Sequence, residues 1–175
     1  MELGLREGLQ TKITSRVKRE ANKIKGKGLY LIANIIRYIH QNYKIGKVQH
    51  RTRTVDEIIK SKLMSGCTDF AHLFIALCRA KRIPALYIET FKKEWLKKPS
   101  KPIQGHIFVE IRIGKNKYIV DPTSGTINIL EKIIDYEILA KGLDYKTLFP
   151  TRSAYIKAIK EKFKTDSNLL NGYYS

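Results

Sequence analysis

The feature that most constrains the fold is a change of hydrophobic periodicity close to Pro84. Before Pro84, apolar residues recur at spacings of three and four, as one face of a helix requires. After it, residues 106–113 alternate apolar and polar side chains, and residues 118–123 follow the turn "GKNK" as a returning strand. Helices followed by an antiparallel sheet indicate the α+β class.

Four helices are predicted in the first half of the chain, over residues 5–24, 29–45, 54–64 and 67–80. The first has a basic face and an apolar stripe of Leu5, Leu9, Ile13, Val17, Ala21 and Ile24. The third opens on a capping box of Thr54 and Glu57. Cys67 opens the fourth, and Pro84 disfavours helix beyond it.

After Pro84, the sequence predicts a strand over residues 85–91, a basic loop over 92–105 and then the hairpin described above. The chain is expected to become helical from 127, to form a terminal helix over 151–164 and to end in a frayed tail. Thr151 or Ser153 would cap the terminal helix. Trp95 in the basic loop is either a lid that contacts substrate or an aromatic anchor for the loop.

The net charge of +18 favours acidic partners, namely nucleic acid, an anionic membrane or an acidic protein. The alternative is a lysine-rich surface that only keeps the protein in solution. No apolar run is long enough to span a bilayer, and the N-terminus lacks the pattern of a secretory signal. Cys67 and Cys78 would be separated by roughly 16 Å of helix, too far for a disulfide. We therefore expect a cytoplasmic protein with two free thiols.

The position of Cys67 at a helix start suits a nucleophile. A helix N-terminus favours the thiolate, and its free N–H groups can hold an oxyanion. Such a nucleophile needs a base and a residue that orients the base. His106 begins the first hairpin strand and Asp121 ends the second. In a hairpin closed by an even-numbered loop, two residues whose numbers sum to an odd value lie on the same face of the sheet, so His106 and Asp121 should face the same way.

The register of this hairpin is a separate prediction. A turn closed on Lys115 and Asn116 would set Asp121 opposite Glu110. A bulge or a strong twist would then have to bring Asp121 to His106.

The stretches "GCTDFAHLFIALCRAKRIPA", "GHIFVEI" and "YIVDPT" together resemble the transglutaminase-like superfamily, over about residues 30–125. The resemblance implies a papain-like fold, with a helical part that carries Cys67 against an antiparallel sheet that carries His106 and Asp121. It also implies that Cys67 is the nucleophile, His106 the general base and Asp121 the orienting residue.

The chain is expected to form one domain, at residues 1–175. Within it we expect a basic amphipathic helix at 1–28, a catalytic core at 29–130 and a C-terminal helical extension at 131–175.

The expected reaction is attack of a thiolate on an amide or ester carbonyl, followed by transfer of the acyl group to water. Hydrolysis of a peptide or protein amide is favoured over crosslinking because water is the simpler acceptor. Lysines of the loop before His106 would favour acidic substrates. A side-chain donor for the oxyanion stays open among Gln41, Tyr43 and Gln49.

No cofactor or metal is expected. The chain shows no acidic cluster for calcium, and the candidate zinc ligands Cys67, His72, Cys78 and His106 lack the close pairing of zinc sites. Cys78 is interpreted as a core residue, His72 as structural or exposed, and Asp69 as a carboxylate favoured by the helix dipole.

The alternative function is a catalytically silent module that binds nucleic acid or another anionic partner through its basic surface. The joint presence of Cys67, His106 and Asp121 favours the enzyme. A role at a membrane surface ranks last, because the apolar stripe of the first helix has no tryptophan or phenylalanine.

Overall fold

The computed structural model of this protein describes residues 2–97, 104–128 and 133–163. Within these ranges the helices are the 3₁₀ turn η1 (Leu3–Leu5) and α1 (Ser15–Asn22), α2 (Gly28–Asn42), α3 (Val55–Ser61), α4 (Cys67–Ala80), α5 (Lys93–Lys97), α6 (Tyr145–Leu148) and α7 (Arg152–Phe163). The strands are β1 (Lys44–Ile45), β2 (Leu63–Met64), β3 (Ala85–Lys92), β4 (Gly105–Ile113), β5 (Asn116–Asp121), β6 (Thr126–Asn128) and β7 (Tyr136–Gly142). None of the helices described is both long and apolar enough to cross a membrane.

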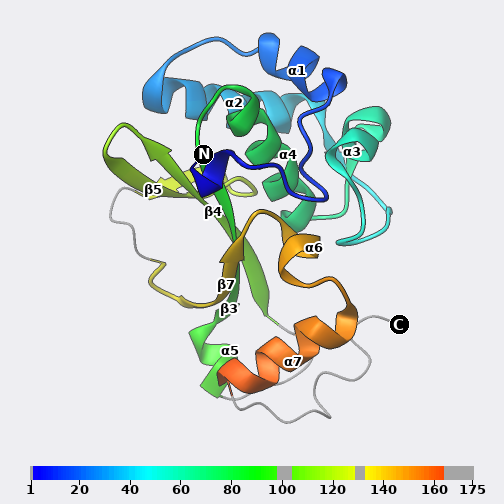
Figure 1. The fold of residues 1–175 in the computed structure, drawn as a ribbon, viewed down its shortest axis with the longest axis vertical. Helices are drawn as coiled ribbons and strands as arrows, with labels where there is room; N and C mark the ends of the chain where they lie inside the picture. Colours follow the sequence, from blue (N-terminus) through cyan, green and yellow to red (C-terminus); the bar gives the residue numbers. More distant parts are fainter. Residues whose placement is uncertain (1, 98–103, 129–132, 164–175) are drawn as a thin grey trace.

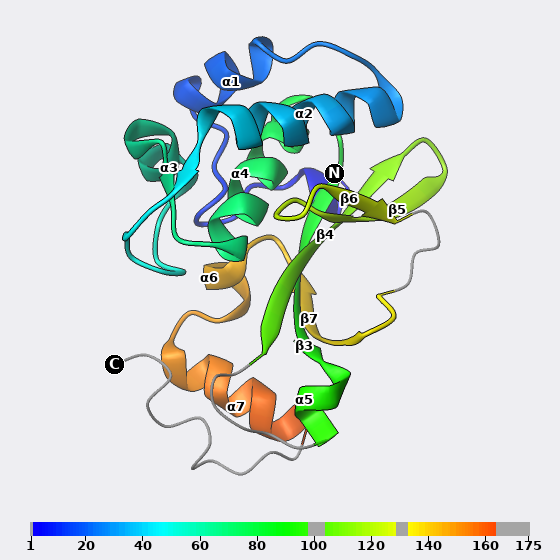
Figure 2. The ribbon, with the colours of Figure 1, turned by 180° about the vertical axis from the view of Figure 1, so that it is seen from behind.

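The expected α+β class is confirmed. Strands β6, β5, β4, β3 and β7 form, in that order, a sheet in which every neighbouring pair is antiparallel. Helices α1 to α4 gather at one end of the molecule, and α5 and α7 lie at the opposite end (Figures 1 and 2). The short parallel pair of β1 and β2 ties the segment after α2 to the segment before α4.

Helix α4 lies at the centre of the helical layer. Every side chain from Thr68 to Arg79 is buried, and α4 packs against α1, α2 and α3 as well as against β3 and β4. A mostly apolar helix that is buried on all sides needs such surroundings. Its first residue, Cys67, is therefore held by most of the core.

Arg79, near the end of α4, joins segments that are far apart in sequence. Its guanidinium donates hydrogen bonds to the carbonyl oxygens of Gly4, Ala85 and Leu143 and, at 2.7 Å, to the hydroxyl of Thr11. Burial lowers the pKa of Arg79 to about 10, so the group stays charged at neutral pH. One buried cation thus connects α4 with the N-terminal segment, β3 and the chain that follows β7.

Several predicted elements are confirmed. Helix α2 lies within residues 29–45 apart from its first residue, and α4 has the predicted bounds. The capping box of Thr54 and Glu57 opens α3. At the start of α7, the Thr151 hydroxyl accepts a hydrogen bond from the Ala154 N–H, so Thr151 is the capping residue.

The prediction of one long helix over residues 5–24 is wrong, and only α1 forms there. The Thr14 side chain caps α1, because it accepts a hydrogen bond from the N–H of Val17. Upstream, Gln10 bonds through its side chain to the carbonyls of Arg51 and Arg53. These tertiary hydrogen bonds hold the segment out of a helix, and Leu9 of the expected stripe is 59% exposed.

Two further predictions need correction in the second half of the chain. The basic loop over 92–105 contains helix α5, while residues 98–103, including Lys98 and Lys101, lie outside the described residues. The segment from 127 contributes β6 and the edge strand β7 rather than a helix. The extension at 131–175 is therefore only partly helical, and the tail from 164 also lies outside the description.

We predict that Arg79→Met lowers the unfolding free energy by about 3 kcal/mol, because it leaves buried carbonyl oxygens without a donor. For a chain of this size that loss corresponds to a fall in melting temperature of roughly 6 to 12 °C. Thermal unfolding followed by circular dichroism measures it. The control is Arg19→Met, which changes an exposed residue of α1; equal melting of the two variants would contradict the role of Arg79.

Candidate active site

Cys67 occupies the first position of α4 with its side chain partly exposed. Gly66 before it has a φ of 148°, a conformation that favours glycine, so the chain can turn sharply into the helix. The first N–H groups of a helix have no partner within the helix. The thiol therefore lies where a helix N-terminus stabilises negative charge.

Asp69 secures this turn from inside the core. Its Oδ2 accepts hydrogen bonds from the Ser65 N–H at 2.8 Å and from the Ser65 hydroxyl at 3.0 Å. The same oxygen forms a buried ion pair with Arg53 at 3.1 Å. Attraction to the helix dipole, inferred from the sequence, is therefore only part of the role of Asp69. Because Ser65 and Gly66 directly precede Cys67, these bonds restrict where the thiol can lie.

His106 and Asp121 lie on neighbouring strands, and His106 Nε2 is 2.9 Å from Asp121 Oδ2. The predicted register is wrong by two residues, because β4 and β5 pair Val109 with Val120 and the turn is Gly114–Lys115. This register places Asp121 one diagonal step from His106 on the same face, and no bulge between β4 and β5 is needed. The φ of 60° at Gly114 explains why the turn closes there.

The His106 ring interacts with both Cys67 and Asp121. Burial alone would lower the pKa of this ring, but its hydrogen bonds to Asp121 and Cys67 and the charges of both groups raise the pKa to about 9. Since Nε2 faces Asp121, Nδ1 is the ring nitrogen left for the thiol. The ring is positively charged at neutral pH, and an imidazolium beside a cysteine favours the thiolate.

Asp121 is held in turn by the residues that follow it. Its carboxylate accepts hydrogen bonds from the Thr123 N–H at 2.9 Å and from the Ser124 hydroxyl at 2.8 Å. Burial alone would raise the pKa of Asp121, but the contacts with His106 and Ser124 lower it below its ordinary value. Sequence reasoning missed Thr123 and Ser124, although an Asp-Pro-Thr-Ser-Gly run is typical of a turn in which aspartate bonds to the following backbone.

Two aromatic rings border the His106 imidazole. The Phe108 ring lies perpendicular to it with centroids 5.0 Å apart, and the Tyr136 ring lies 5.9 Å away. A cavity of about 250 Å³ opens beside them and is lined by Phe108, Asp121 and Tyr136, among others. Tyr136 was missed because its segment was expected to be helical, whereas strand β7 brings it to the sheet.

The three candidates for a side-chain oxyanion donor lie in different surroundings. Tyr43 is buried, and its hydroxyl oxygen accepts a hydrogen bond from Lys62 at 3.1 Å. Gln41 and Gln49 are exposed, and in the described part of the chain neither forms a hydrogen bond with Cys67. The donors already in place at the thiol are the free N–H groups at the start of α4.

The remaining residues considered from the sequence lie inside the core. Cys78 is fully buried, and burial raises the pKa of its thiol. His72 is also buried, and its Nε2 accepts a hydrogen bond from the Tyr145 N–H. Trp95 is 2% exposed and stacks on Phe91, so it anchors α5 to the body rather than forming a lid. Among the residues described, no three His, Cys, Asp or Glu side chains gather as a metal site would require.

Comparison with known proteins places this geometry in context. The family model of the transglutaminase-like superfamily matches residues 11–122. A candidate cysteine protease from Cytophaga hutchinsonii has a similar structure, with a TM-score of 0.64 and 24% identity over 81% of this chain and 46% of that chain. The periplasmic domain of TgpA from Pseudomonas aeruginosa, solved with ethylmercury bound, gives a TM-score of 0.52 and 17% identity over 70% of this chain and 48% of that chain. This chain thus spans less than half of either solved chain, and these likenesses show the fold. No curated protein matches the sequence significantly.

We predict that iodoacetamide modifies Cys67 well before Cys78 in the native protein. Cys67 is partly exposed and has an imidazolium partner, whereas the Cys78 thiol is buried and favours its protonated form. Peptide mapping by mass spectrometry after limited labelling measures the order. Labelling in denaturant is the control and should modify both thiols; preferential native labelling of Cys78 would refute the assignment.

Proposed function

The chain belongs to the transglutaminase-like superfamily, and from this premise we propose that it is a cysteine-dependent enzyme that hydrolyses amide bonds through an acyl-enzyme on Cys67. The observation that carries the proposal is the arrangement of three side chains: His106 Nε2 lies 2.9 Å from Asp121, and Cys67 is near enough to His106 to raise the pKa of its ring. Such a set supplies a nucleophile, a proton carrier and an orienting carboxylate.

In the first half of the proposed reaction, the Cys67 sulfur attacks the carbonyl carbon of the amide. The negative charge that develops on the carbonyl oxygen is held by the N–H groups at the start of α4. His106 then gives its proton to the nitrogen as the carbon–nitrogen bond breaks, and the amine leaves. The acyl group remains on Cys67 as a thioester.

In the second half, His106 accepts a proton from a water molecule as the water oxygen attacks the thioester carbon. The carbon–sulfur bond breaks, the acid leaves, and the thiolate and imidazolium are restored. Asp121 holds the ring with Nε2 toward itself throughout, so that Nδ1 faces the reacting atoms. An amine that entered in place of water would give transfer instead of hydrolysis; water is the simpler acceptor.

The chemistry near His106 also bears on the choice of substrate. A cavity of about 490 Å³ is lined by three lysines, two acidic residues and one aromatic residue, namely Lys92, Lys93, Lys97, Glu94, Asp135 and Tyr136. Lys93 also forms an exposed ion pair with Glu137 at 3.6 Å. Because Tyr136 also contacts His106, these lysines lie close to the site of reaction. We propose that they attract acidic peptide substrates, since a positive rim raises the local concentration of anions.

We also propose that the protein acts in a reducing compartment such as the cytoplasm. Both of its cysteines are free thiols, and the proposed nucleophile works only in the reduced form.

We predict that Cys67→Ala abolishes amide hydrolysis and acyl-enzyme formation, with a loss of roughly 10⁴-fold or more, because no neighbouring group replaces a nucleophile. His106→Ala is expected to act similarly. The assay is turnover of a fluorogenic peptide amide, with intact-mass detection of the acyl-enzyme. Cys78→Ala is the matched control and should keep most of its activity. Full activity of Cys67→Ala would refute the mechanism.

We predict that Asp121→Asn reduces turnover by roughly 10²- to 10⁴-fold and moves the alkaline limb of the pH–rate profile to lower pH. Asp121 is one of the groups that raise the pKa of His106 to about 9. Without its charge the ring loses its proton at a lower pH.

The same substitution should alter stability against pH. The folded protein holds the His106 proton more tightly than the unfolded chain does, because the pKa of His106 is raised to about 9. The resulting contribution to the unfolding free energy is fully present below the unfolded pKa of about 6.5 and is lost as the pH rises toward about 9. The unfolding free energy of the wild type should therefore fall between these pH values more than that of Asp121→Asn. Identical profiles would contradict the pairing.

We predict that changing Lys93 and Lys97 together to Gln slows turnover of an acidic peptide amide and reduces its dependence on salt, while a neutral peptide is spared. Screening acts over about 10 Å at 0.1 M salt, so the attraction is strongest at low ionic strength. Lys12 and Lys18, which are exposed, changed to Gln serve as the control for total charge. Unchanged kinetics with both peptides would show that these lysines do not steer substrate.

A further inference from the structure

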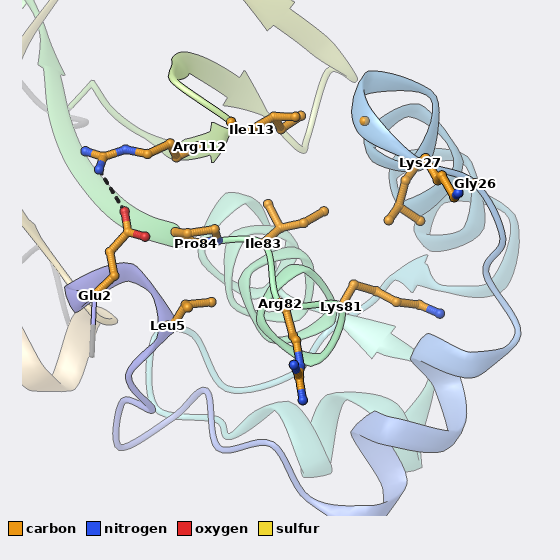
Figure 3. Close-up of a pocket in the computed structure, with 13 residues that line it drawn as sticks. Glu2, Leu5, Gly26, Lys27, Lys81, Arg82, Ile83, Pro84, Arg112 and Ile113 are labelled. Atoms are coloured by element: carbon orange, nitrogen blue, oxygen red, sulfur yellow. Dashed lines mark ion pairs between the residues drawn. The ribbon is translucent and has the colours of Figure 1, made fainter.

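A cationic hollow lies at the end of α4 that is distant from Cys67. Its volume is about 600 Å³, a size typical of ligand sites. The floor is apolar and is formed by Leu5, Leu31, Ile83, Pro84 and Ile113. In Figure 3, Ile83 and Pro84 lie near the middle of this hollow, while the charged side chains extend outward around them.

Four cations line this hollow, namely Lys27, Lys81, Arg82 and Arg112, and we call it the basic pocket. Glu2 is its one acidic lining residue, and Glu2 forms an ion pair with Arg112 at 2.9 Å (Figure 3). In the described part of the chain, the side chains of Lys27, Lys81 and Arg82 form no ion pair. The pocket therefore keeps a surplus of positive charge that its own surroundings do not neutralise.

The charge continues beyond the lining residues. Four segments line the basic pocket. The one at residues 2–5 carries Glu2, whereas the stretches 25–28, 81–84 and 112–117, which contain most of the other lining residues, have no aspartate or glutamate. Their cations are Lys25, Lys27, Lys81, Arg82, Arg112, Lys115 and Lys117. These three stretches are distant in sequence, but together they form one positive surface. Such a surface attracts a polyanion rather than a single small ion.

An exposed aromatic ring borders this surface. Tyr30, in the first turn of α2, is 66% exposed, and its ring lies beside Gly26, which lines the pocket. A base can stack on an exposed tyrosine while lysines hold the phosphates on either side. Arg82 has a φ of 60°, a left-handed conformation that costs energy for a residue other than glycine, yet it displays a cation at the rim.

We propose that the basic pocket and Tyr30 form a binding site for single-stranded nucleic acid. Phosphates lie on the lysines and arginines of the rim, one unstacked base enters over the apolar floor, and a neighbouring base stacks on Tyr30. A duplex fits this surface less well, because its bases are paired and cannot enter a hollow. The site is about 20 Å from Cys67 along α4, so it is separate from the site of the proposed hydrolysis.

The test is fluorescence anisotropy with a labelled 12-residue oligouridylate and the matching oligothymidylate, over a salt series. Changing Lys27, Lys81 and Arg82 together to Gln should weaken binding roughly tenfold or more. It should also lower the slope of log Kd against log salt by about 2, because each lost phosphate contact with a single strand lowers this slope by about 0.7. The matched control changes Lys157, Lys160 and Lys162 of α7, at the other end of the molecule, to Gln (Figure 1). This control should change binding less than twofold.

Tyr30 gives an independent readout. Tyr30→Leu should weaken binding roughly fivefold or more with an unchanged salt slope, and Tyr30→Phe should retain binding, because stacking needs the ring and not the hydroxyl. Cys67→Ala should bind as the wild type does, so this inference and the proposed hydrolysis can fail separately.

Three results would overturn the proposal. Equal weakening by the two triple variants would assign binding to diffuse charge. Tighter binding of a duplex of the same length would exclude a single-strand site. Binding of the wild type to vesicles containing phosphatidylserine, but to neither oligonucleotide, would assign the surface to a membrane. Circular dichroism of every variant ensures that the proteins compared are folded.

Discussion

The burial of α4 is the constraint on which the other parts of the structure depend. A helix that is buried on all sides has no exposed face that would tolerate a shift toward solvent. Each of its ends is held by a buried arginine. Arg53 bonds to Asp69 in the first turn, and Arg79 near the last turn donates to three separate segments. Removing either cation would leave buried acceptors unsatisfied, so both ends of the helix are fixed in position.

A second network supports the turn before Cys67. His50 lies 3.2 Å from the Ser65 hydroxyl, and Arg51 donates to the His50 ring. Arg51 in turn forms a buried ion pair with Glu89 of β3 at 2.9 Å. Burial, with the nearby charge of Arg51, lowers the pKa of His50 to about 4, so its ring is neutral at physiological pH and can accept this hydrogen bond. The loop before α3 is thereby joined to the sheet and to the start of α4.

The sheet provides the other half of the candidate site through its register. Strand β4 pairs with β5 as far as Val109 and Val120, so on that side no strand is paired with β4 at His106 in the described structure. The start of α4 can therefore approach the imidazole at the end of β5. Thr90 of β3 lies between His106 and Ile138 on the adjacent strands, and the rings of Phe108 on β4 and Tyr136 on β7 contact each other with centroids 5.3 Å apart.

Two of the cationic regions of the described structure lie far apart. Lys93 and Lys97 lie near the proposed reaction centre, whereas the basic pocket lies at the far end of α4. The two surfaces can be tested independently, because no residue lines both cavities.

The sequence by itself determined those features that depend on local patterns. The bounds of α4, the capping box of α3, the α+β class and the shared face of His106 and Asp121 follow from periodicity, capping chemistry and parity. These signals act within a few residues of chain, so no knowledge of distant partners is needed to read them.

Only the tertiary structure decided the features that depend on distant contacts. The apolar stripe from Leu5 to Ile24 did not become one helix, because the Gln10 amide is bonded to carbonyls about forty residues away. The hairpin register followed a glycine turn one residue earlier than predicted. Tyr136 lies beside His106 because its segment forms an edge strand and not the expected helix. Lys27, Arg82 and Arg112 line one pocket because segments distant in sequence pack together there. Local propensities are worth a few tenths of a kcal/mol per residue up to about 1. Several buried hydrogen bonds together outweigh them, including those that the N–H groups of Gln10 and Thr11 donate to the Asp144 carboxylate.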